Sequence, residues 1–297
     1  LYNRADSQSL SSEEFDRRFK FCGKKMGELI SGRPQSRKAN SRQGLLTEGW
    51  LWASNKGTAV LERNPEAAEG KLEFLRLRIA PKGAKGPIAN SMRSLNGASV
   101  RKSDLPDHVV KKDGMVWIDQ IPMVDQGPKG YCVVASIQRL FEHYGIPCDQ
   151  HQLAQVMDSD TDRGTNSTAV MKSLGKIDYR FKTRFNALAV PFTDGRMYAV
   201  RVRGSGKFDR GSEFDEKDFK KAVVKNVDDG IPILWSLQLG RFPEEPSISQ
   251  QAGGGHMRLI IGYEESGQKL IFSDSWGAGH ERKKMQMDHA YQATTGL

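Results

Sequence analysis

The spacing of apolar side chains near the start of the chain predicts one amphipathic helix. Phe15, Phe19 and Cys22 recur at helical intervals, and Ser11–Glu14 provides a serine cap with acidic residues in the first turn. The following stretch, 31–42 (SGRPQSRKANSR), is polar and predicts a loop.

Strand patterns follow the loop. Residues 50–52 (WLW) and 58–61 (TAVL) flank 54–57 (SNKG), a sequence suited to a hairpin turn. Residues 72–79 (LEFLRLRI) alternate apolar and charged side chains from Phe74 on, which is typical of a half-buried strand. We expect residues 1–110 to form a β-rich N-terminal region of unknown role, a propeptide or an accessory domain, and find no motif for chemistry in it.

Past the N-terminal region, helices alternate with strands. The turn-rich loop 125–130 (DQGPKG) leads into 132–144, where apolar residues keep helical spacing and Gly145 is placed to end the helix. Two more helices are expected, one at 149–157 and one that follows 164–167 (GTNS) and runs to about residue 174.

The last third of the chain predicts a helix and an antiparallel hairpin. The helix is expected at 215–227 and a strand at 231–237, and strands 257–263 and 269–273 are separated by a short polar turn. Helices beside antiparallel strands predict an α+β fold for a second domain, 111–297.

Composition and charge favour an ordinary globular protein. Apolar residues make up 37% of the chain and charged residues 27%. Lys and Arg outnumber Asp and Glu by 45 to 36, a net charge of +9. The basic residues are scattered without interleaved aromatic side chains, so we expect a solvated surface and no nucleic-acid partner. No apolar run approaches the ~18–20 residues of a membrane-spanning helix.

The N-terminus and the cysteines add two expectations. The chain begins at Leu1 rather than methionine, from which we expect a processed, exported or cell-envelope protein. Cys22, Cys132 and Cys148 form no Cys-x-x-Cys pair and have no histidines at zinc-site spacing. We therefore expect no metal and no cofactor, and at least one free thiol.

Cys132 stands where a thiol becomes reactive. It begins the helix 132–144, whose first backbone N–H groups lack partners within the helix and form the positive end of its dipole. Both features stabilise the thiolate, which is the nucleophilic form of cysteine. A buried cysteine that packs as a small apolar side chain is equally compatible with this position.

Gln126 lies six residues before Cys132. Its side-chain amide can turn back beside the thiol and, together with the backbone N–H of Cys132, donate hydrogen bonds to an oxyanion. The alternative is a solvated loop glutamine.

His256 and Asp274 frame the predicted hairpin. If its strands pair symmetrically about residue 265, the two residues lie at the same end, where the carboxylate can orient the imidazole and support its charge. A histidine satisfied by local backbone, or Asp288 as the orienting group, is the alternative.

Three segments together resemble the papain family of cysteine peptidases. Residues 126–136 (QGPKGYCVVAS) are similar to the family's Gln-Gly-x-x-Gly-x-Cys motif, 256–263 (HMRLIIGY) to its His before an apolar strand and Gly-Tyr, and 273–277 (SDSWG) to its Asn-Ser-Trp-Gly. They stand in the family's order, and the resemblance covers roughly residues 116–297. Aspartate in place of asparagine is more similar to the bacterial relatives that include the bacteriocin-leader (double-glycine) peptidases.

The resemblance implies a papain-like fold, with helices on one side of a small antiparallel sheet, and hydrolysis of a peptide or protein substrate through an acyl-enzyme. It also implies that Trp276 shields the contact between Asp274 and His256 from water. Val133 departs from the family's aromatic residue after the nucleophile, so the resemblance implies the family's mechanism and not its substrate specificity. The expected site residues are Cys132 (nucleophile), His256 (base), Asp274 (orienting group) and Gln126 (oxyanion), with Gly130, Tyr131, Gly255 and Trp276 at the substrate.

Two other functions stay open. A transglutaminase-like acyltransferase also uses Cys, His and Asp in this order, and Gln126 six residues before Cys132 counts against it. A non-catalytic binding module with the same fold is disfavoured by the complete set of four residues.

Overall fold

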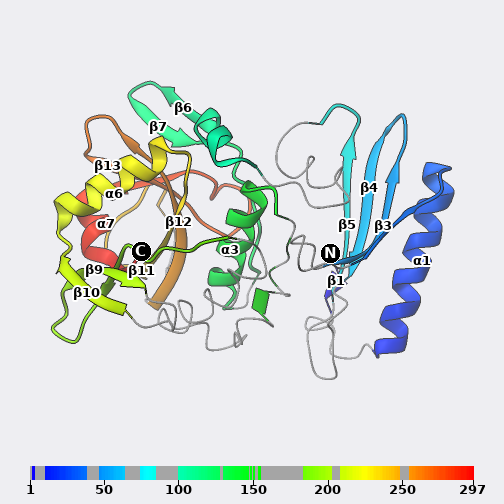
Figure 1. The fold of residues 1–297 in the computed structure, drawn as a ribbon, viewed down its shortest axis with the longest axis horizontal. Helices are drawn as coiled ribbons and strands as arrows, with labels where there is room; N and C mark the ends of the chain where they lie inside the picture. The colour runs from blue at the N-terminus through cyan, green and yellow to red at the C-terminus, as the bar shows by residue number, and fades with distance from the viewer. Residues whose placement is uncertain are drawn as a thin grey trace.

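The computed structural model describes residues 2–3, 11–38, 47–63, 74–84, 100–127, 130–146, 148, 150, 153–154, 183–202, 208–247 and 254–297. Within these ranges the protein is α+β, as predicted, and its strands pair antiparallel (Figure 1). Its helices are α1 (Ser12–Ile30), the 3-10 helix η3 (Lys102–His108), α3 (Cys132–His143), α6 (Glu216–Asp228) and α7 (Met287–Ala293). None of these described helices has the length and apolar character to cross a membrane.

The N-terminal part forms a five-stranded sheet with α1 along its outer face (Figure 1). Ser11 caps α1 by accepting a hydrogen bond from the backbone N–H of Glu14 at 3.2 Å, and Phe15 and Phe19 share a core with Trp52 of the sheet. The helix, hairpin and strand expected in this region are confirmed. In spatial order the strands are β1 (Tyr2–Asn3), β5 (Phe74–Pro81), β4 (Gly57–Arg63), β3 (Glu48–Ala53) and β2 (Gln35–Arg37).

The loop expected at 31–42 was wrong in its middle, because residues 35–37 form β2 and pair with β3. A strand at the edge of a sheet is held by backbone hydrogen bonds, so it needs no apolar pattern of its own. The Arg37 side chain is nevertheless 2% exposed. Hydrophobic periodicity gives no sign of such a strand.

A seven-stranded sheet dominates the second half of the chain (Figure 1). Its long central strand β12 (Gly254–Glu264) pairs with β11 (Ile233–Leu239) on one edge and with β13 (Lys269–Ser273) on the other. On the same edge as β11, β7 (Met115–Ile118) pairs with the last residues of β12. Gly262 permits this crowding, because a Cβ there would lie 2.4 Å from the carbonyl oxygen of Val116. The other strands are β6 (Val109–Lys112), β14 (Lys283–Gln286) and β15 (Thr294–Gly296).

A separate three-stranded sheet and two helices complete this half. The sheet consists of β8 (Ala189–Pro191), β9 (Met197–Val202) and β10 (Phe208–Glu213). The helix expected at 215–227 is confirmed as α6, and Asp215 caps it by accepting a hydrogen bond from the backbone N–H of Asp218 at 2.9 Å. The expected helix at 149–157 is described only at 150 and 153–154, and the helix expected after 164–167 lies outside the described residues.

Helix α3 carries the predicted nucleophile and packs against β12. It spans Cys132–His143, and Gly145 follows in the left-handed conformation with φ 72°, as the expected helix end requires. Ser136 donates a hydrogen bond to the carbonyl oxygen of Met257 on β12 at 3.3 Å. The start of the helix is thereby fixed beside the end of the long hairpin.

The inner face of the N-terminal sheet meets the other end of α3. Arg76 of β5 donates to the carbonyl oxygen of Cys148 at 2.9 Å and lies 3.5 Å from the carboxylate of Glu142. Arg76 also pairs with Glu62 of β4 at 3.2 Å. Buried ionic contacts therefore link the N-terminal sheet to Glu142, about 15 Å from Cys132 along the axis of α3.

Candidate active site

Cys132 is the first residue of α3 and is half-buried, with a free thiol. The residue before it, Tyr131, provides no side-chain cap. The N–H groups of the first helical turn have no partners within the helix, and the dipole of α3 places its positive end at the thiol. The start of α3 thus directs backbone N–H donors and the positive end of the helix dipole toward the sulfur of Cys132.

His256 lies near the start of β12 and contacts Asp274. Its Nε2 is 2.7 Å from Oδ1 of Asp274, and the ring is 7% exposed. Burial acts to lower the pKa of His256, but hydrogen bonds and charge interactions with Asp274 and with Cys132 outweigh it and raise this pKa to about 9. Since Nε2 faces Asp274, Nδ1 is the ring nitrogen that remains for the thiol.

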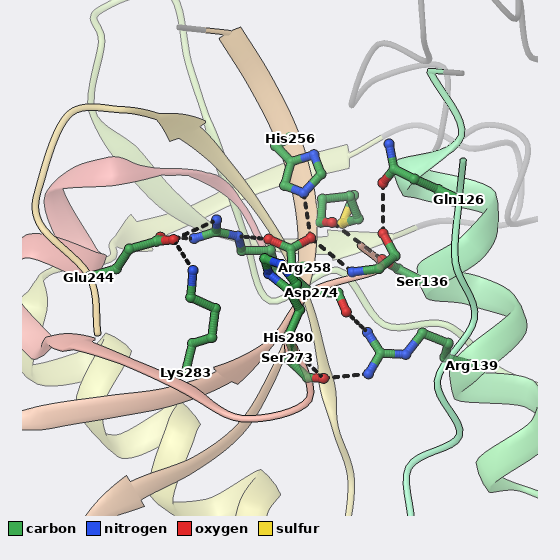
Figure 2. A network of polar contacts seen from close by, with 12 residues as sticks. Gln126, Ser136, Arg139, Glu244, His256, Arg258, Ser273, Asp274, His280 and Lys283 are labelled. Carbon is green, nitrogen blue, oxygen red and sulfur yellow. Dashed lines mark hydrogen bonds and ion pairs between the residues drawn. The ribbon is translucent and has the colours of Figure 1, made fainter. Parts of the chain in front are cut away.

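Asp274 follows the last residue of β13 and is completely buried. Its Oδ1 also accepts the backbone N–H of Ser275 at 2.8 Å, and its Oδ2 accepts Nε of Arg258 at 2.6 Å (Figure 2). Burial acts to raise the pKa of Asp274, yet the hydrogen bond from His256 and the charges of His256 and Arg258 bring it below its ordinary value. The group is therefore a carboxylate at neutral pH.

The symmetric register expected for the hairpin was wrong by two residues. Leu259 pairs with Ser273, and continuing that register places Asp274 opposite Arg258 rather than His256. The turn is centred later than residue 265, and a bulge at Ile261 inserts one extra residue into β12. A shift of two residues preserves the face of the strand, so His256 still reaches Asp274.

Gln126 is brought to the same site by Ser275. The hydroxyl of Ser275 donates to Oε1 of Gln126 at 2.8 Å, and the backbone N–H of Gln126 donates to the carbonyl oxygen of Ser275 at 2.8 Å (Figure 2). Occupying the carbonyl end of the amide fixes its orientation, so the NH2 end is the one turned away from Ser275. This is the end that an oxyanion donor requires.

The residues expected at the substrate differ in their surroundings. Trp276 stacks on His256, with ring centroids 4.7 Å apart. Gly255, the residue before His256, is exposed. Gly130 is half-buried, but Tyr131 is completely buried in the core around α3. Neither the side chain nor the backbone of Tyr131 is therefore exposed to a substrate.

Four buried charged residues around Asp274 were missed by sequence reasoning: Arg139, Glu244, Arg258 and Lys283. Arg139 of α3 donates to the carbonyl oxygens of Asp274 and Pro122, both at 2.8 Å, and to the hydroxyl of Ser273 (Figure 2). The one available signal was Arg258 inside the apolar run 257–263, since a charge within a buried strand needs a partner.

The other histidines show no metal cluster. Among the described residues, no three His, Cys, Asp or Glu side chains gather as a metal site would need. His280 lies edge-on to Trp276 at 5.6 Å, and His289 stacks on Phe242 at 4.5 Å. Cys22 and Cys148 are not joined in a disulfide, and His151 and the glycine-rich 204–206 lie outside the described residues.

The arrangement combines a thiol at a helix start, an imidazole between that thiol and a carboxylate, and amide donors beside the thiol. Such a set can generate a thiolate, transfer a proton and stabilise negative charge on a carbonyl oxygen. Comparison with known proteins adds one finding: a sequence model described as the Peptidase_C39 like family matches residues 118–297. No curated protein matches the chain.

Proposed function

The chain belongs to the Peptidase_C39 like family, and from that membership we propose that it is a cysteine peptidase with Cys132 as nucleophile. His256 is its base, Asp274 orients His256, and Gln126 contributes to the oxyanion site. The observation that carries the proposal is the chain of contacts through His256, whose pKa is raised by both Asp274 and Cys132.

In this mechanism the thiol proton of Cys132 resides on His256, and the thiolate attacks the carbonyl carbon of the peptide bond. The carbonyl oxygen becomes an oxyanion that accepts from the Cys132 backbone N–H and the Gln126 amide. His256 then gives its proton to the departing amine as the C–N bond breaks, which leaves a thioester on Cys132. Water, deprotonated by His256, attacks the thioester and releases the acid, and the thiol is restored.

The wider architecture is proposed in the same terms. Residues 111–297 form the peptidase domain, with a papain-like arrangement in which α3 lies against one side of an antiparallel sheet. Support comes from the contacts of α3 with β12 and from the site between them. Residues 1–110 form an accessory region whose sheet contacts the far end of α3 through Arg76.

A peptide panel tests the proposal and its rivals. The panel includes peptides with two glycines before the expected cleavage point, and matched peptides without them. We expect the wild-type protein to hydrolyse at least one class of peptide, Cys132→Ala to hydrolyse none, and Cys22→Ala, which removes another half-buried thiol, to remain active. Hydrolysis by Cys132→Ala at the wild-type rate contradicts the proposal.

A primary amine added to the same assay separates peptidase from acyltransferase. Water and the amine compete for the thioester, so a peptidase releases mainly the free acid and a transferase mainly the amide. Mass spectrometry of the products distinguishes the two. Predominant amide at low amine concentration would favour the transglutaminase-like alternative.

A further inference from the structure

The carboxylate of Asp274 is shared between two cations. Oδ1 faces His256 at 2.7 Å, while Oδ2 faces Nε of Arg258 at 2.6 Å (Figure 2). Arg258 is fully buried and lies on the same strand as His256, two residues further along. Residues two apart on a strand share a face, so β12 presents both cations to one carboxylate.

Arg258 is in turn held from its other side. Its Nη1 and Nη2 contact the two carboxylate oxygens of Glu244 at 2.6 and 3.4 Å, and Lys283 of β14 donates to the same carboxylate. Glu244 is fixed by the backbone of its neighbour, because Glu245 and Lys284 exchange two 2.8 Å hydrogen bonds. The guanidinium also lies over Phe272, 4.5 Å from the ring centroid.

These contacts form a buried row whose charges alternate in sign. In the thiolate–imidazolium state the row reads Cys132, His256, Asp274, Arg258, Glu244 and Lys283, so each anion lies between cations or ends the row. Arg258 is the cation that faces Oδ2 of Asp274, so it opposes the negative charge of Asp274 on the side away from His256.

We propose that Arg258, held by Glu244, which Lys283 also contacts, is a positioning residue for Asp274. It fixes the second carboxylate oxygen of Asp274 and weakens the effect of the Asp274 charge on His256. A role of Arg258 in catalysis rests on the proposed function, whereas the contacts of Arg258 do not depend on that function. Arg258 touches no reacting atom and acts through Asp274.

Other charged groups face the same carboxylate and imidazole. Arg139 reaches from α3 to the backbone carbonyl of Asp274, and Glu281 is near enough to Arg139 to oppose the burial that lowers its pKa. The described titratable or charged groups around Asp274 and His256 are Cys132 and Arg139 on α3, Glu244 between β11 and β12, Arg258 on β12, His280 and Glu281 after β13, and Lys283 on β14.

The sign of the effect follows from the charges. Replacing Arg258 with an uncharged residue removes a cation beside Asp274, so the imidazolium of His256 becomes more stable and its titration moves to higher pH. Replacing Glu244 with an uncharged residue removes an anion and moves the titration to lower pH. A residue that only packed would move neither.

The test is an NMR titration of histidine side chains labelled with 15N, in which His256→Gln identifies the His256 signals. We expect Arg258→Gln to raise the titration midpoint of His256 by about 0.5 to 1 pH unit, and Glu244→Gln to lower it by a similar amount. Arg258→Lys keeps the charge and is expected to restore the wild-type midpoint. Arg76→Gln, which removes a buried arginine from the N-terminal sheet, is the matched control and is expected to leave the midpoint of His256 in the folded protein unchanged.

An unchanged midpoint in Glu244→Gln, or shifts of the same sign in Arg258→Gln and Glu244→Gln, overturns the inference. If Arg258→Gln does not fold, Arg258→Lys and Glu244→Gln decide the question. The titration needs no substrate, so its outcome is separate from that of the peptidase assay. If the wild-type protein cleaves no peptide, the proposed peptidase function is rejected. If the wild-type protein is active but the midpoint of His256 is the same in all variants, only the role of Arg258 is rejected.

Discussion

At the scale of single residues, His256 depends on neighbours that pull its pKa in opposite directions. Burial favours the neutral ring, while Asp274 and Cys132 favour the imidazolium and prevail. A thiolate–imidazolium pair loses its proton as pH rises through this raised pKa. Activity should therefore persist into mildly alkaline solution, to roughly pH 9.

Asp274→Asn tests the source of this raised pKa. Asparagine can still accept a hydrogen bond from His256 but carries no charge, so the pKa of His256 falls and the alkaline limb of the pH–rate profile moves to lower pH, by about 1 to 3 units. Asp288→Asn, in the first turn of α7, serves as the control. A wild-type alkaline limb in Asp274→Asn would show that the carboxylate charge does not act on His256.

Gln126→Ala tests the oxyanion site. Loss of one preorganised donor lowers the rate by roughly a hundred- to a thousandfold, and substrate affinity should stay nearly unchanged. Ser275→Ala leaves the amide present but removes the hydroxyl that orients it, so it should cost less than Gln126→Ala. Single-turnover kinetics separate the two effects, and a change confined to affinity would assign Gln126 to substrate binding instead.

At the scale of elements, α3 joins the site to the rest of the fold at both of its ends. Arg139 holds the backbone of Asp274 from the middle of the helix, and His143 at its end approaches the carbonyl oxygen of Gly230, with Nε2 3.2 Å away. Burial lowers the pKa of His143 to about 4. The helix end is thus a neutral contact at ordinary pH.

The buried His143 predicts a loss of stability in acid. In the unfolded chain it takes up a proton near its ordinary pKa of about 6.5, whereas in the folded protein it does so only near 4. Stability is therefore intact above pH 6.5 and falls between pH 6.5 and 4, by about 3 kcal/mol from this residue. Urea unfolding at pH 7 and pH 4.5 should show a smaller acid loss in His143→Gln than in the wild type, and equal losses would contradict the assignment.

The sequence predicted those elements whose signal is local. The helix from Cys132 and the hairpin strands follow from apolar spacing, and the cap and glycine at the helix ends follow from single residues. The register of β12 with β13 was not predictable in the same way, because the bulge at Ile261 depends on pairing across the sheet. The His256–Asp274 contact was still anticipated, since a two-residue shift keeps both side chains on one face.

The charged row beyond Asp274 could not be found from the sequence. Glu244 and Lys283 are far from Arg258 along the chain, and no spacing rule relates the three. Arg258 itself interrupts an apolar strand, which signals a partner but does not identify one. The polar strand β2 is hidden in the sequence for the same reason, because it forms by pairing with β3 and has no pattern of its own.

At the scale of the whole molecule, Arg76 links the N-terminal sheet to α3. It pairs with Glu62 and Glu142, which are both buried, so Arg76→Gln should lower the free energy of unfolding by about 3–5 kcal/mol. Because Arg76 lies at the far end of α3, the rate per folded molecule should stay near that of the wild type. Urea unfolding and a peptidase assay at the same temperature check both parts. A lower rate without a lower free energy of unfolding would instead show that the N-terminal sheet influences the active site.

Trapping the acyl-enzyme tests the central claim most directly. The protein is mixed with a peptide substrate, and the reaction is quenched in acid during turnover. The protein is then digested, and its peptides are analysed by mass spectrometry. The account predicts a thioester adduct of the substrate's N-terminal product on Cys132 in the wild type, and none in Cys132→Ala. Peptide hydrolysis at the wild-type rate in Cys132→Ala, with no adduct on Cys132 in either protein, would contradict it.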